Sequence, residues 1–570
     1  MFKFLNIKRK KYTEINPDEI FMDSSNIPGY DRSQLEGRIE KPIKKFALYS
    51  IFVFFGLVAT AFFIQIWNLQ IIDGKKYASR SEGNMLRPIP IFAARGTISD
   101  RNGVLIVWNE PSEEKNIDLI LSQDEINSVS KREYATTSGM AHIQGYVQYP
   151  LKDKNGFYYQ EDFEGIDGAE EYFNDRLRGV NGSRLVEVDA RGQIVSESVV
   201  RPAKPGENIK LSIDSRIQSN LYKNIKDIAE RVGFVGGAGV IMDINTGEVL
   251  AMASYPEFDS QIMSDKEDQN AVISALTNKS LPFLNRAIDG LYVPGSIIKP
   301  YIALGVLNEK IIDPLKIVNE TGSIFLTNPY DPTKSTIFRD WKSLGFVDMK
   351  HAIALSSDVY FYVVGGGYKD QKGLGIINID KYLQMFGFGM PISKSFFSGK
   401  TGTIPTPEWK KITFDEDWYI GDTYHTAIGQ YGMQVTPIQV ARAVSAIANS
   451  GSLLVPTLEI GQKQIESTID IPIEYFNIVR EGMSMSVNIG TSKALNVPYT
   501  KIAGKSGTAE LGVTKEKVNS WITGFWPYEN PKYAFAVILE KGSVHNLIGA
   551  AAVMRQQLDW MAIYTPEYFK

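Results

Sequence analysis

A stretch of 22 residues, 46–67, contains no charged side chain, and this feature restricts the possible folds of the chain more than any other. As a helix, a segment of this length spans the hydrocarbon core of a lipid bilayer, which is about 30 Å thick. Three lysines stand just before it, and positive residues beside a membrane span remain on the cytoplasmic side. The pattern predicts a single-pass anchor in the cytoplasmic (inner) membrane, with residues 1–45 in the cytoplasm and residues 68–570 on the extracytoplasmic (periplasmic) side.

A cleaved signal peptide is the alternative interpretation of this segment. A signal peptide has a shorter apolar region and a cleavage site made of small residues. Here residues 1–45 precede the apolar stretch, and the sequence NLQIIDGKKY after it offers no such cleavage site. We therefore predict a retained transmembrane helix at 46–67. The mixed charges of the preceding tail, and its lack of apolar periodicity, indicate little structure there.

The composition is that of a folded protein with more than one domain. The chain has 570 residues, of which 44% are hydrophobic and 22% charged. A net charge of −4 gives no reason to expect binding to nucleic acid. The absence of cysteine excludes disulfides and thiolate chemistry, and the four histidines are scattered without metal-binding spacing. We predict neither a metal nor a cofactor.

Two regions follow the anchor. Residues 68–205 are rich in short alternating stretches and turn signals, and RGTISDRNGVLIV, 95–107, predicts a strand, a turn and a second strand. The segment RPAKPGENI, 201–209, has two prolines and a glycine and indicates a linker. We predict a β-rich domain at 68–205 and a second domain at 206–570.

The second region alternates helices and strands. The segment 211–232 predicts the end of a strand followed by an amphipathic helix, and 237–255 predicts a hairpin. Near the C-terminus, SWITGFWPY and YAFAVILEKG predict two strands, and 549–565 predicts a closing helix. Because strands occur at both ends of the region with helices between them, we expect one sheet assembled from distant segments, in a domain of α/β (α+β) class.

The pattern Ser-x-x-Lys occurs three times, and only one occurrence lies in a setting suited to chemistry. Those beginning at Ser112 and Ser128 lie in polar runs typical of a solvated surface. In YVPGSIIKPYIALGVL, by contrast, Ser296 precedes a long apolar helix, so it lies where free backbone N–H groups point outward. Residues three apart share a helix face, which would let Lys299 reach the Ser296 hydroxyl. The alternative is a serine that merely caps a core helix.

A serine that attacks a carbonyl needs a base, and the sequence contains neither a suitable His–Asp pair nor a G-x-S-x-G motif. A lysine can be the base only when neutral, and lowering a lysine pKa from about 10.4 to near 7 costs roughly 4–5 kcal/mol. Burial and a neighbouring cation can supply this. A second lysine would serve, and could also bind an anionic substrate.

Two Lys-[Thr/Ser]-Gly triplets could provide that second lysine. The triplet 400–402 is followed by two prolines two residues apart, which argue against a central strand. The triplet 505–507 precedes the C-terminal strand pair, where a strand edge presents backbone N–H groups and Gly507 permits close approach of a substrate. We therefore assign the function to Lys505 and predict a non-functional loop at 400–402.

A third element, Ser356-Ser357-Asp358, lies between two helical runs. Residues two apart do not share a helix face, so Ser356 and Asp358 can converge only if this segment is a loop. A pair of helix-capping residues is the alternative interpretation.

Taken in order, Ser296–Lys299, Ser356–Asp358 and Lys505–Gly507 resemble the motifs of the penicillin-binding proteins and serine β-lactamases. The segments RGTISDRNG and GIDGAEEYFNDRLRG are similar to the membrane-proximal pedestal of class B penicillin-binding proteins. Within class B, FRDWKSLG and GDTYHTAIGQ look more like the elongation type (penicillin-binding protein 2) than the septal type. The resemblance covers nearly everything after the anchor.

The resemblance implies a penicillin-binding/β-lactamase-like transpeptidase domain, with an antiparallel sheet and helices on both faces, above a β-rich pedestal of dimerisation type. It implies that Ser296 attacks a D-Ala–D-Ala stem peptide while Lys299 takes its proton, and that the N–H groups of Ser296 and Thr508 hold the oxyanion. The roles implied for the remaining positions are proton relay by Ser356, orientation by Asp358, and binding of the substrate carboxylate by Lys505, Ser506 and Thr508.

The implied function is a peptidoglycan D,D-transpeptidase of cell-wall elongation that β-lactams inhibit. The implied partners are a SEDS-family glycosyltransferase and other membrane proteins of the elongation complex. Some members of this type carry a zinc site with a cysteine and a histidine, but this chain has no cysteine and has Phe346 where the histidine is often found. Three alternatives stay open: a septal transpeptidase, a hydrolase of the D,D-carboxypeptidase or β-lactamase kind, and a non-catalytic activator of the glycosyltransferase.

Overall fold

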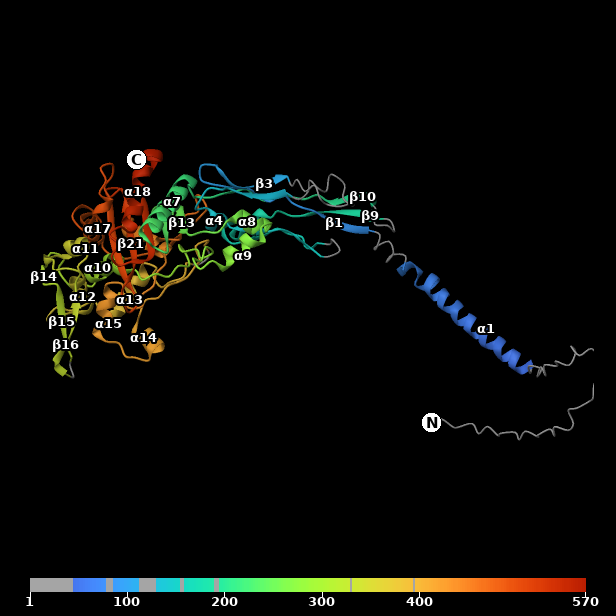
Figure 1. Cartoon of the computed structure of the whole chain (residues 1–570), viewed down its shortest axis with the longest axis horizontal. Coiled ribbons are helices and arrows are strands. Elements are labelled where there is room, and N and C mark those ends of the chain that lie inside the picture. The colour runs from blue at the N-terminus through green and yellow to red at the C-terminus, as the bar shows by residue number, and fades with distance from the viewer. Residues whose placement is uncertain are drawn as a thin grey trace, which may run out of the picture. The chain divides into compact units, whose positions relative to one another are not determined.

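The computed structural model describes residues 45–77, 86–111, 130–153, 158–188, 194–328, 331–392 and 395–570 (Figure 1). The chain divides into two compact units, Met1–Leu86 and Arg87–Lys570, each described by itself below. The predicted cytoplasmic tail lies outside the described residues.

The first unit contains a long apolar helix, α1, Lys45–Trp67, which continues as one π-helical stretch, Asn68–Ile72. Its described side chains are almost all exposed, including its phenylalanines. Among the described residues, Leu48–Ile72 is the one helical stretch long and apolar enough to cross a membrane. The predicted helix at 46–67 is confirmed, and its apolar surface is consistent with membrane anchoring.

The first part of the second unit is β-rich, as predicted. One sheet has the strand order β1-β9-β10, a second has the order β11-β2-β3-β4, and two further strand pairs are β5-β8 and β6-β7. The predicted strand–turn–strand at 95–107 appears as β2 and β3. The bounds are β1 Leu86–Ile91, β2 Ile98–Ser99, β3 Leu105–Pro111, β4 Ser130–Tyr134, α4 Ala141–Gln144, β5 Tyr146–Gln148, β6 Leu151–Lys152, β7 Tyr158–Gln160, β8 Glu164–Ile166, α5 Gly168–Tyr172, α6 Asn174–Leu177, β9 Gly182–Val188, β10 Ile194–Arg201 and β11 Ile209–Lys210.

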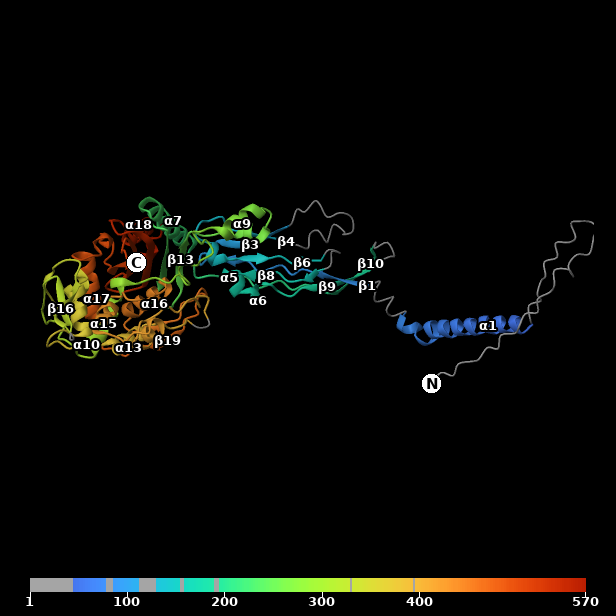
Figure 2. The same ribbon diagram turned by 60° about the horizontal axis from the view of Figure 1, so that its bottom comes forward.

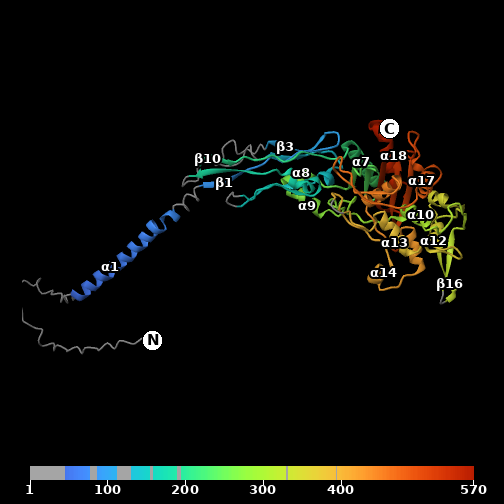
Figure 3. The same cartoon turned by 180° about the vertical axis from the view of Figure 1, so that it is seen from behind.

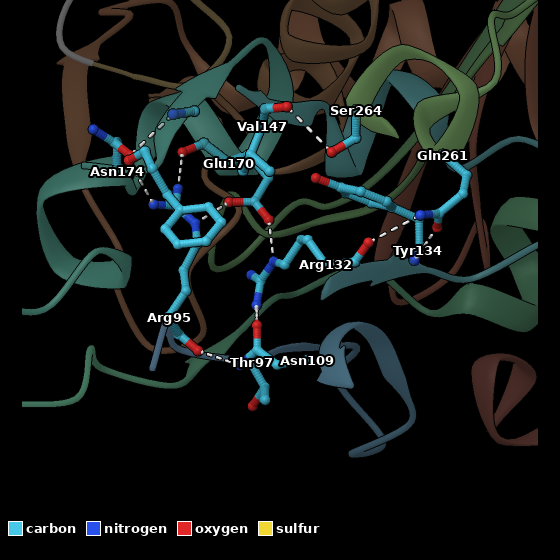
Figure 4. A network of polar contacts seen from close by, with 12 residues as sticks. Arg95, Thr97, Asn109, Arg132, Tyr134, Val147, Glu170, Asn174, Gln261 and Ser264 are labelled. Carbon is cyan, nitrogen blue, oxygen red and sulfur yellow. Dashed lines mark hydrogen bonds and ion pairs between the residues drawn. The ribbon is translucent and has the colours of Figure 1, made fainter. Parts of the chain in front are cut away.

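A buried ionic cluster ties the elements of this β-rich part together (Figure 4). The Glu170 carboxylate on α5 accepts hydrogen bonds from Arg95 Nε at 2.6 Å and from Arg132 Nε at 2.7 Å. Arg132 also donates to Asn109 Oδ1 on β3 at 2.8 Å. All three charged side chains are buried, so one carboxylate neutralises part of the charge of two desolvated guanidinium groups.

Hydrogen bonds join this β-rich part to the second domain. Asp100 Oδ2 accepts a hydrogen bond from Ser215 Oγ at 2.7 Å, at the start of helix α7, Ser215–Val232. The Glu257 carboxylate accepts hydrogen bonds from the N–H groups of Gly139 at 2.6 Å and Ala141 at 3.1 Å. The Glu257 carboxylate of the second domain thus holds the turn at 139–141 in the β-rich part.

Glu257 makes this junction sensitive to pH. Burial is the largest cause that raises the pKa of Glu257, to about 7. Between its unfolded value, near 4.3, and about 7, the native protein binds a proton that the unfolded chain does not, so raising the pH through this window lowers stability by up to about 4 kcal/mol. Glu257→Gln should therefore gain stability relative to wild type as the pH rises from 5 to 8, measured by thermal unfolding. Exposed Glu267→Gln is the matched control, and equal pH dependence of the two variants would refute the assignment.

The second domain is built on one antiparallel sheet with the strand order β13-β12-β22-β21-β20. The predicted hairpin forms β12, Gly236–Asp243, and β13, Val249–Tyr255, and the C-terminal segments form β20, Ala503–Leu511, β21, Lys517–Trp526, and β22, Tyr533–Ser543. The predicted assembly of one sheet from distant segments is confirmed. Its last strand, β20, lies at an edge.

Helices cover both faces of this sheet, because its side chains alternate between two apolar cores. Figure 2 shows α7 and the closing helix α18, Ala550–Tyr564, on one side of β13 and α16, Pro437–Ala448, on the other. On the α16 side the sheet contributes Ala238, Val240, Met242, Ala536 and Ile538. On the α7 and α18 side it contributes Ile241, Ile522, Val537 and Leu539.

Helix α10, Lys299–Asn308, is buried along nearly its whole length and packs against α11, α12, α13 and α17. A hairpin of β15 and β16 lies beside α12 (Figures 1 and 3). The bounds are α8 Ser260–Asp265, α9 Gln269–Thr277, β14 Val318–Glu320, β15 Ser323–Asn328, β16 Asp331–Arg339, β17 Gly345–Val347, α11 Met349–Leu355, α12 Asp358–Gly366, α13 Ile376–Met385, α14 Pro407–Phe414, α15 Ile420–Ala427, β18 Ser452–Leu454, β19 Ile465–Thr468 and α17 Ile473–Asn488. The 3₁₀ turns among the described residues of this domain are Gly295–Ile298, Lys493–Leu495 and Pro566–Phe569.

Candidate active site

Ser296 lies in a 3₁₀ turn, Gly295–Ile298, that leads directly into α10. Gly295 has φ of 57° and donates its N–H to the Gly429 carbonyl at 2.9 Å. A Cβ atom at Gly295 would lie 2.9 Å from the Thr508 carbonyl oxygen, so only glycine lets this turn pack so closely against β20. The packing places the partly buried Ser296 at the start of a core helix and beside the edge strand of the sheet.

Lys299, one turn further along, is fully buried. Its Nζ donates to Asp358 Oδ1 at 2.6 Å, to the Ser356 carbonyl at 2.8 Å and to Ser356 Oγ at 3.3 Å. Within the described residues, the Ser296 hydroxyl makes no hydrogen bond. Among the described residues, the Lys299 Nζ therefore makes its hydrogen bonds to Ser356 and Asp358 and not to the Ser296 hydroxyl that its spacing would let it reach. Such contacts often tighten only when substrate is bound.

Ser356 and Asp358 reach Lys299 because the chain breaks between two helices at this point. Ser356 ends α11 in the left-handed conformation, with φ of 60° and ψ of 40°, and Asp358 begins α12. The helix cap of α12 is Ser357, whose Oγ accepts a hydrogen bond from Tyr360 N–H at 3.0 Å. The segment is thus a turn, in which the capping role belongs to the middle residue and the outer two side chains face the lysine.

Lys505 enters from β20 and completes the cluster. Its Nζ donates to Ser356 Oγ at 2.9 Å and to the Ser506 carbonyl at 2.9 Å. The side chain is fully buried, and this burial, together with the positive charge of Lys299, holds the pKa of Lys505 well below its usual value. Asp358 acts in the opposite direction. The Ser356 hydroxyl therefore links two buried lysines that come from segments more than 200 residues apart in sequence.

Of the three residues after Lys505 on β20, Ser506 is partly buried, Gly507 is buried and Thr508 is exposed. Ser506 Oγ donates to Thr491 Oγ1 at 2.7 Å. A Cβ atom at Gly507 would lie 2.8 Å from the Pro294 carbonyl oxygen and 2.9 Å from Ile297 Cγ2, so the strand and the Ser296 turn can touch only at a glycine. Among the described strands β20 pairs only with β21, and the turn that carries Ser296 packs against β20.

The competing triplet, 400–402, lies in a loop outside this cluster. Lys400 is exposed, and its N–H donates to the Ile288 carbonyl. The Thr401 carbonyl accepts a hydrogen bond from Gln439 Nε2 at 2.8 Å. The triplet at 505–507, and not the one at 400–402, shares the cluster with Lys299 and Ser356.

Sequence reasoning assigned no role to two residues that contact this cluster. Asp340 Oδ2 accepts a hydrogen bond from Ser357 Oγ at 3.0 Å, and Thr491 contacts Ser506. Asp340 lies in the FRDWKSLG segment already noted for its family resemblance, which was the available signal. Thr491 lies in a stretch without any motif, so nothing in the sequence points to it.

No group of three or more His, Asp or Glu side chains that could hold a metal ion occurs in the part of the chain that the structure describes. Phe346, at the position often taken by a histidine, is 75% exposed. The arrangement that remains is a serine at a helix start, a hydroxyl shared by two buried amines, and a free strand edge. These are the components of a serine acyl-transfer site that uses lysine as its base.

Comparison with known proteins agrees with this chemistry. Residues 237–559 match the penicillin binding protein transpeptidase domain, and residues 120–211 match the penicillin-binding protein dimerisation domain. The chain is 30% identical to the peptidoglycan D,D-transpeptidase MrdA of Haemophilus influenzae, covering 90% of this chain and 91% of that protein. It is 27% identical to MrdA of Escherichia coli K12, covering 87% and 90%.

Solved structures give the same result. The crystal structure of Pseudomonas aeruginosa PBP2 in complex with WCK 5153 has a TM-score of 0.65 and 30% identity, covering 83% of this chain and 97% of that one. The complex between PBP2 and MreC from Helicobacter pylori has a TM-score of 0.68 and 26% identity, covering 85% and 100%.

Proposed function

This chain belongs to the penicillin-binding transpeptidases as a peptidoglycan D,D-transpeptidase of the MrdA (penicillin-binding protein 2) elongation type, and from this premise we propose that Ser296 is its nucleophile. The observation that carries the proposal is the convergence of the Ser296 turn, Lys299, Ser356 and Lys505 around one strand edge. The septal alternative has no support from the MrdA relatives.

Acylation begins when Ser296 Oγ attacks the carbonyl of the penultimate D-Ala of a stem peptide. Lys299, in its neutral amine form, accepts the serine proton, and the N–H groups of Ser296 and Thr508 hold the negative oxygen of the tetrahedral intermediate. The bond between the two D-Ala residues then breaks, and Ser356 passes a proton to the departing amine. The Asp358 carboxylate, with Oδ1 2.6 Å from the Lys299 Nζ, keeps the lysine side chain oriented. A second stem peptide attacks the ester with its amine, which forms the cross-link and returns Ser296.

Lys505, with Ser506 and Thr508, receives the terminal carboxylate of the donor peptide, and Gly507 allows the peptide to approach the strand. β-Lactams carry a carboxylate at the equivalent place and acylate the same serine. Because the pKa of Lys505 is held low in the free protein, an anion bound beside it raises that pKa again. Binding should therefore take up a proton.

We expect uptake of up to one proton when a penicillin binds at pH 7.5. Titration calorimetry of the non-acylating Ser296→Ala variant, repeated in buffers of different ionisation enthalpy, measures it. Lys505→Met should lose the uptake, whereas Lys400→Met, in the other Lys-[Thr/Ser]-Gly triplet, should retain it. Zero uptake in the parent variant would contradict the lowered pKa of Lys505.

The reaction itself distinguishes a transpeptidase from a hydrolase. Purified full-length protein is given a stem pentapeptide donor with and without an amine acceptor peptide. We expect D-Ala release coupled to a cross-linked product that depends on the acceptor. Release of D-Ala with no cross-link, or rapid turnover of penicillin, would favour the D,D-carboxypeptidase or β-lactamase alternative. If neither product forms, activation of a glycosyltransferase is the alternative that is favoured.

The domains follow the same plan. Residues 1–45 form the cytoplasmic tail, 46–67 the transmembrane helix, 68–205 the pedestal and 206–570 the transpeptidase domain, which acts on the extracytoplasmic side. The pedestal and the anchor are the surfaces for other membrane proteins of elongation, a SEDS-family glycosyltransferase among them. The relatives solved as a complex with MreC and as part of a peptidoglycan synthase complex support this assignment.

A further inference from the structure

The carboxylate of Asp340 caps the turn that carries the Ser356–Asp358 motif. Asp340 follows β16, and one of its oxygens, Oδ2, accepts hydrogen bonds both from Ser357 Oγ at 3.0 Å and from Val359 N–H at 2.9 Å. The first N–H groups of a helix have no partner within the helix, so this carboxylate satisfies one such donor of α12 and also fixes the capping serine.

That turn needs external support. Ser356 has φ of 60°, a left-handed conformation that is unfavourable for residues other than glycine and persists only when its surroundings impose it. The same turn places the Ser356 hydroxyl within 2.9 Å of Lys505 Nζ and its carbonyl within 2.8 Å of Lys299 Nζ. A movement of about 1 Å would break this linkage and slow the chemistry.

Asp340 is itself held firmly in place. Its N–H donates to the Gly322 carbonyl at 2.9 Å. Glu320, a fully buried carboxylate, accepts hydrogen bonds from the N–H groups of Gly322 and Leu344. It thereby joins the segment whose Gly322 carbonyl holds Asp340 to the segment that follows Asp340 in sequence. The preceding Phe338 ring packs edge-on against Tyr424, with centroids 5.0 Å apart.

Asp340 is better suited to hold the Ser356–Asp358 turn through its hydrogen bonds than through its negative charge. Burial, followed by the negative charge of Asp358, raises the pKa of Asp340. Lys299 and the two hydrogen bonds act in the opposite direction. The carboxylate is therefore costly to ionise here, while one oxygen atom makes both contacts to the turn.

We propose that Asp340 is a positioning residue for acylation, which holds the Ser356–Asp358 turn through the two hydrogen bonds to Ser357 and Val359, and that Glu320 fixes the loop from which it acts. The inference rests on the proposed function of Ser296 as the acylated residue.

The test compares variants of the full-length protein by the rate of acylation with a fluorescent penicillin, resolved into initial binding and the acylation step. Asp340→Ala should slow the acylation step at least 10-fold while initial binding changes less than 3-fold. Asp340→Asn retains an oxygen that can accept both hydrogen bonds and should recover to within about 3-fold of wild type. Asp331→Ala, at the far end of the strand β16 that precedes Asp340, is the control and should match wild type.

A second pair of variants keeps the inference falsifiable if Asp340→Ala folds poorly. Ser357→Ala removes one of the two contacts and should slow the acylation step about 3- to 10-fold, and Glu320→Gln should slow it in the same direction. Wild-type rates for Asp340→Ala, or for both Ser357→Ala and Glu320→Gln, would overturn the inference. So would an Asp340→Asn variant as slow as Asp340→Ala, because the charge would then be what matters. A wild-type protein that is not acylated would instead refute the proposed function, and the inference with it.

Discussion

Ser296→Ala is expected to abolish covalent labelling by a fluorescent penicillin, with the acylation rate falling at least about 10³-fold. The reason is that no other hydroxyl in the cluster occupies the start of a core helix beside the edge strand. Ser356, the nearest alternative, has its oxygen engaged by two lysines. Labelling is measured on purified full-length protein by gel fluorescence over time.

Ser335→Ala is the matched control, because Ser335 is an exposed serine on β16. It should be labelled at the wild-type rate. Equal labelling of Ser296→Ala and wild type would show that the penicillin reacts elsewhere and would remove the basis of the site assignment. Labelling that shifts to Ser356 would show instead that the two serines exchange roles.

The second large effect concerns stability. Glu170→Ala should destabilise the folded protein by about 3–5 kcal/mol, because it leaves the guanidinium groups of Arg95 and Arg132 buried without their counterion. Figure 4 shows that both groups converge on this one carboxylate. Burial already lowers the pKa of Arg95, which indicates how poorly the site tolerates a positive charge. The measurement is thermal or denaturant unfolding of the full-length protein.

Glu171→Ala removes a carboxylate from the adjacent, exposed position and serves as the control. A surface change of this kind is worth about 0.5 kcal/mol or less. If the two variants unfold together, the cluster does not hold the β-rich part as described. The unfolding transition should be followed with two probes, because a protein of several domains need not unfold in one step.

Local sequence patterns predicted the parts of the fold and site that depend on local rules. The uncharged run 46–67 requires a long apolar helix, and the two prolines after residue 402 correctly separated a loop triplet from a strand triplet. Because positions two apart do not share a helix face, the spacing showed that Ser356 and Asp358 could meet only in a loop, and it left a helix-capping pair open as the alternative. Each of these arguments needs only the residues in the segment itself.

What the sequence could not provide was the identity of partners brought together by folding. Spacing suggested that Lys299 contacts Ser296, but the lysine bonds instead to Ser356 and Asp358, which are nearly 60 residues away in sequence. Asp340 and Glu170 were not predicted at all. A single carboxylate forms no recognisable sequence motif. Its structural role depends on which N–H or guanidinium groups lie beside it in the folded chain.

The most direct test of the whole account is to find the residue that carries the acyl group. Full-length protein treated with penicillin is digested, and the modified peptide is sequenced by mass spectrometry. The account predicts one adduct, on Ser296, that is lost in Ser296→Ala and slowed in Lys505→Met. An adduct on any other serine, or no adduct while D-Ala–D-Ala cross-linking continues, would contradict it.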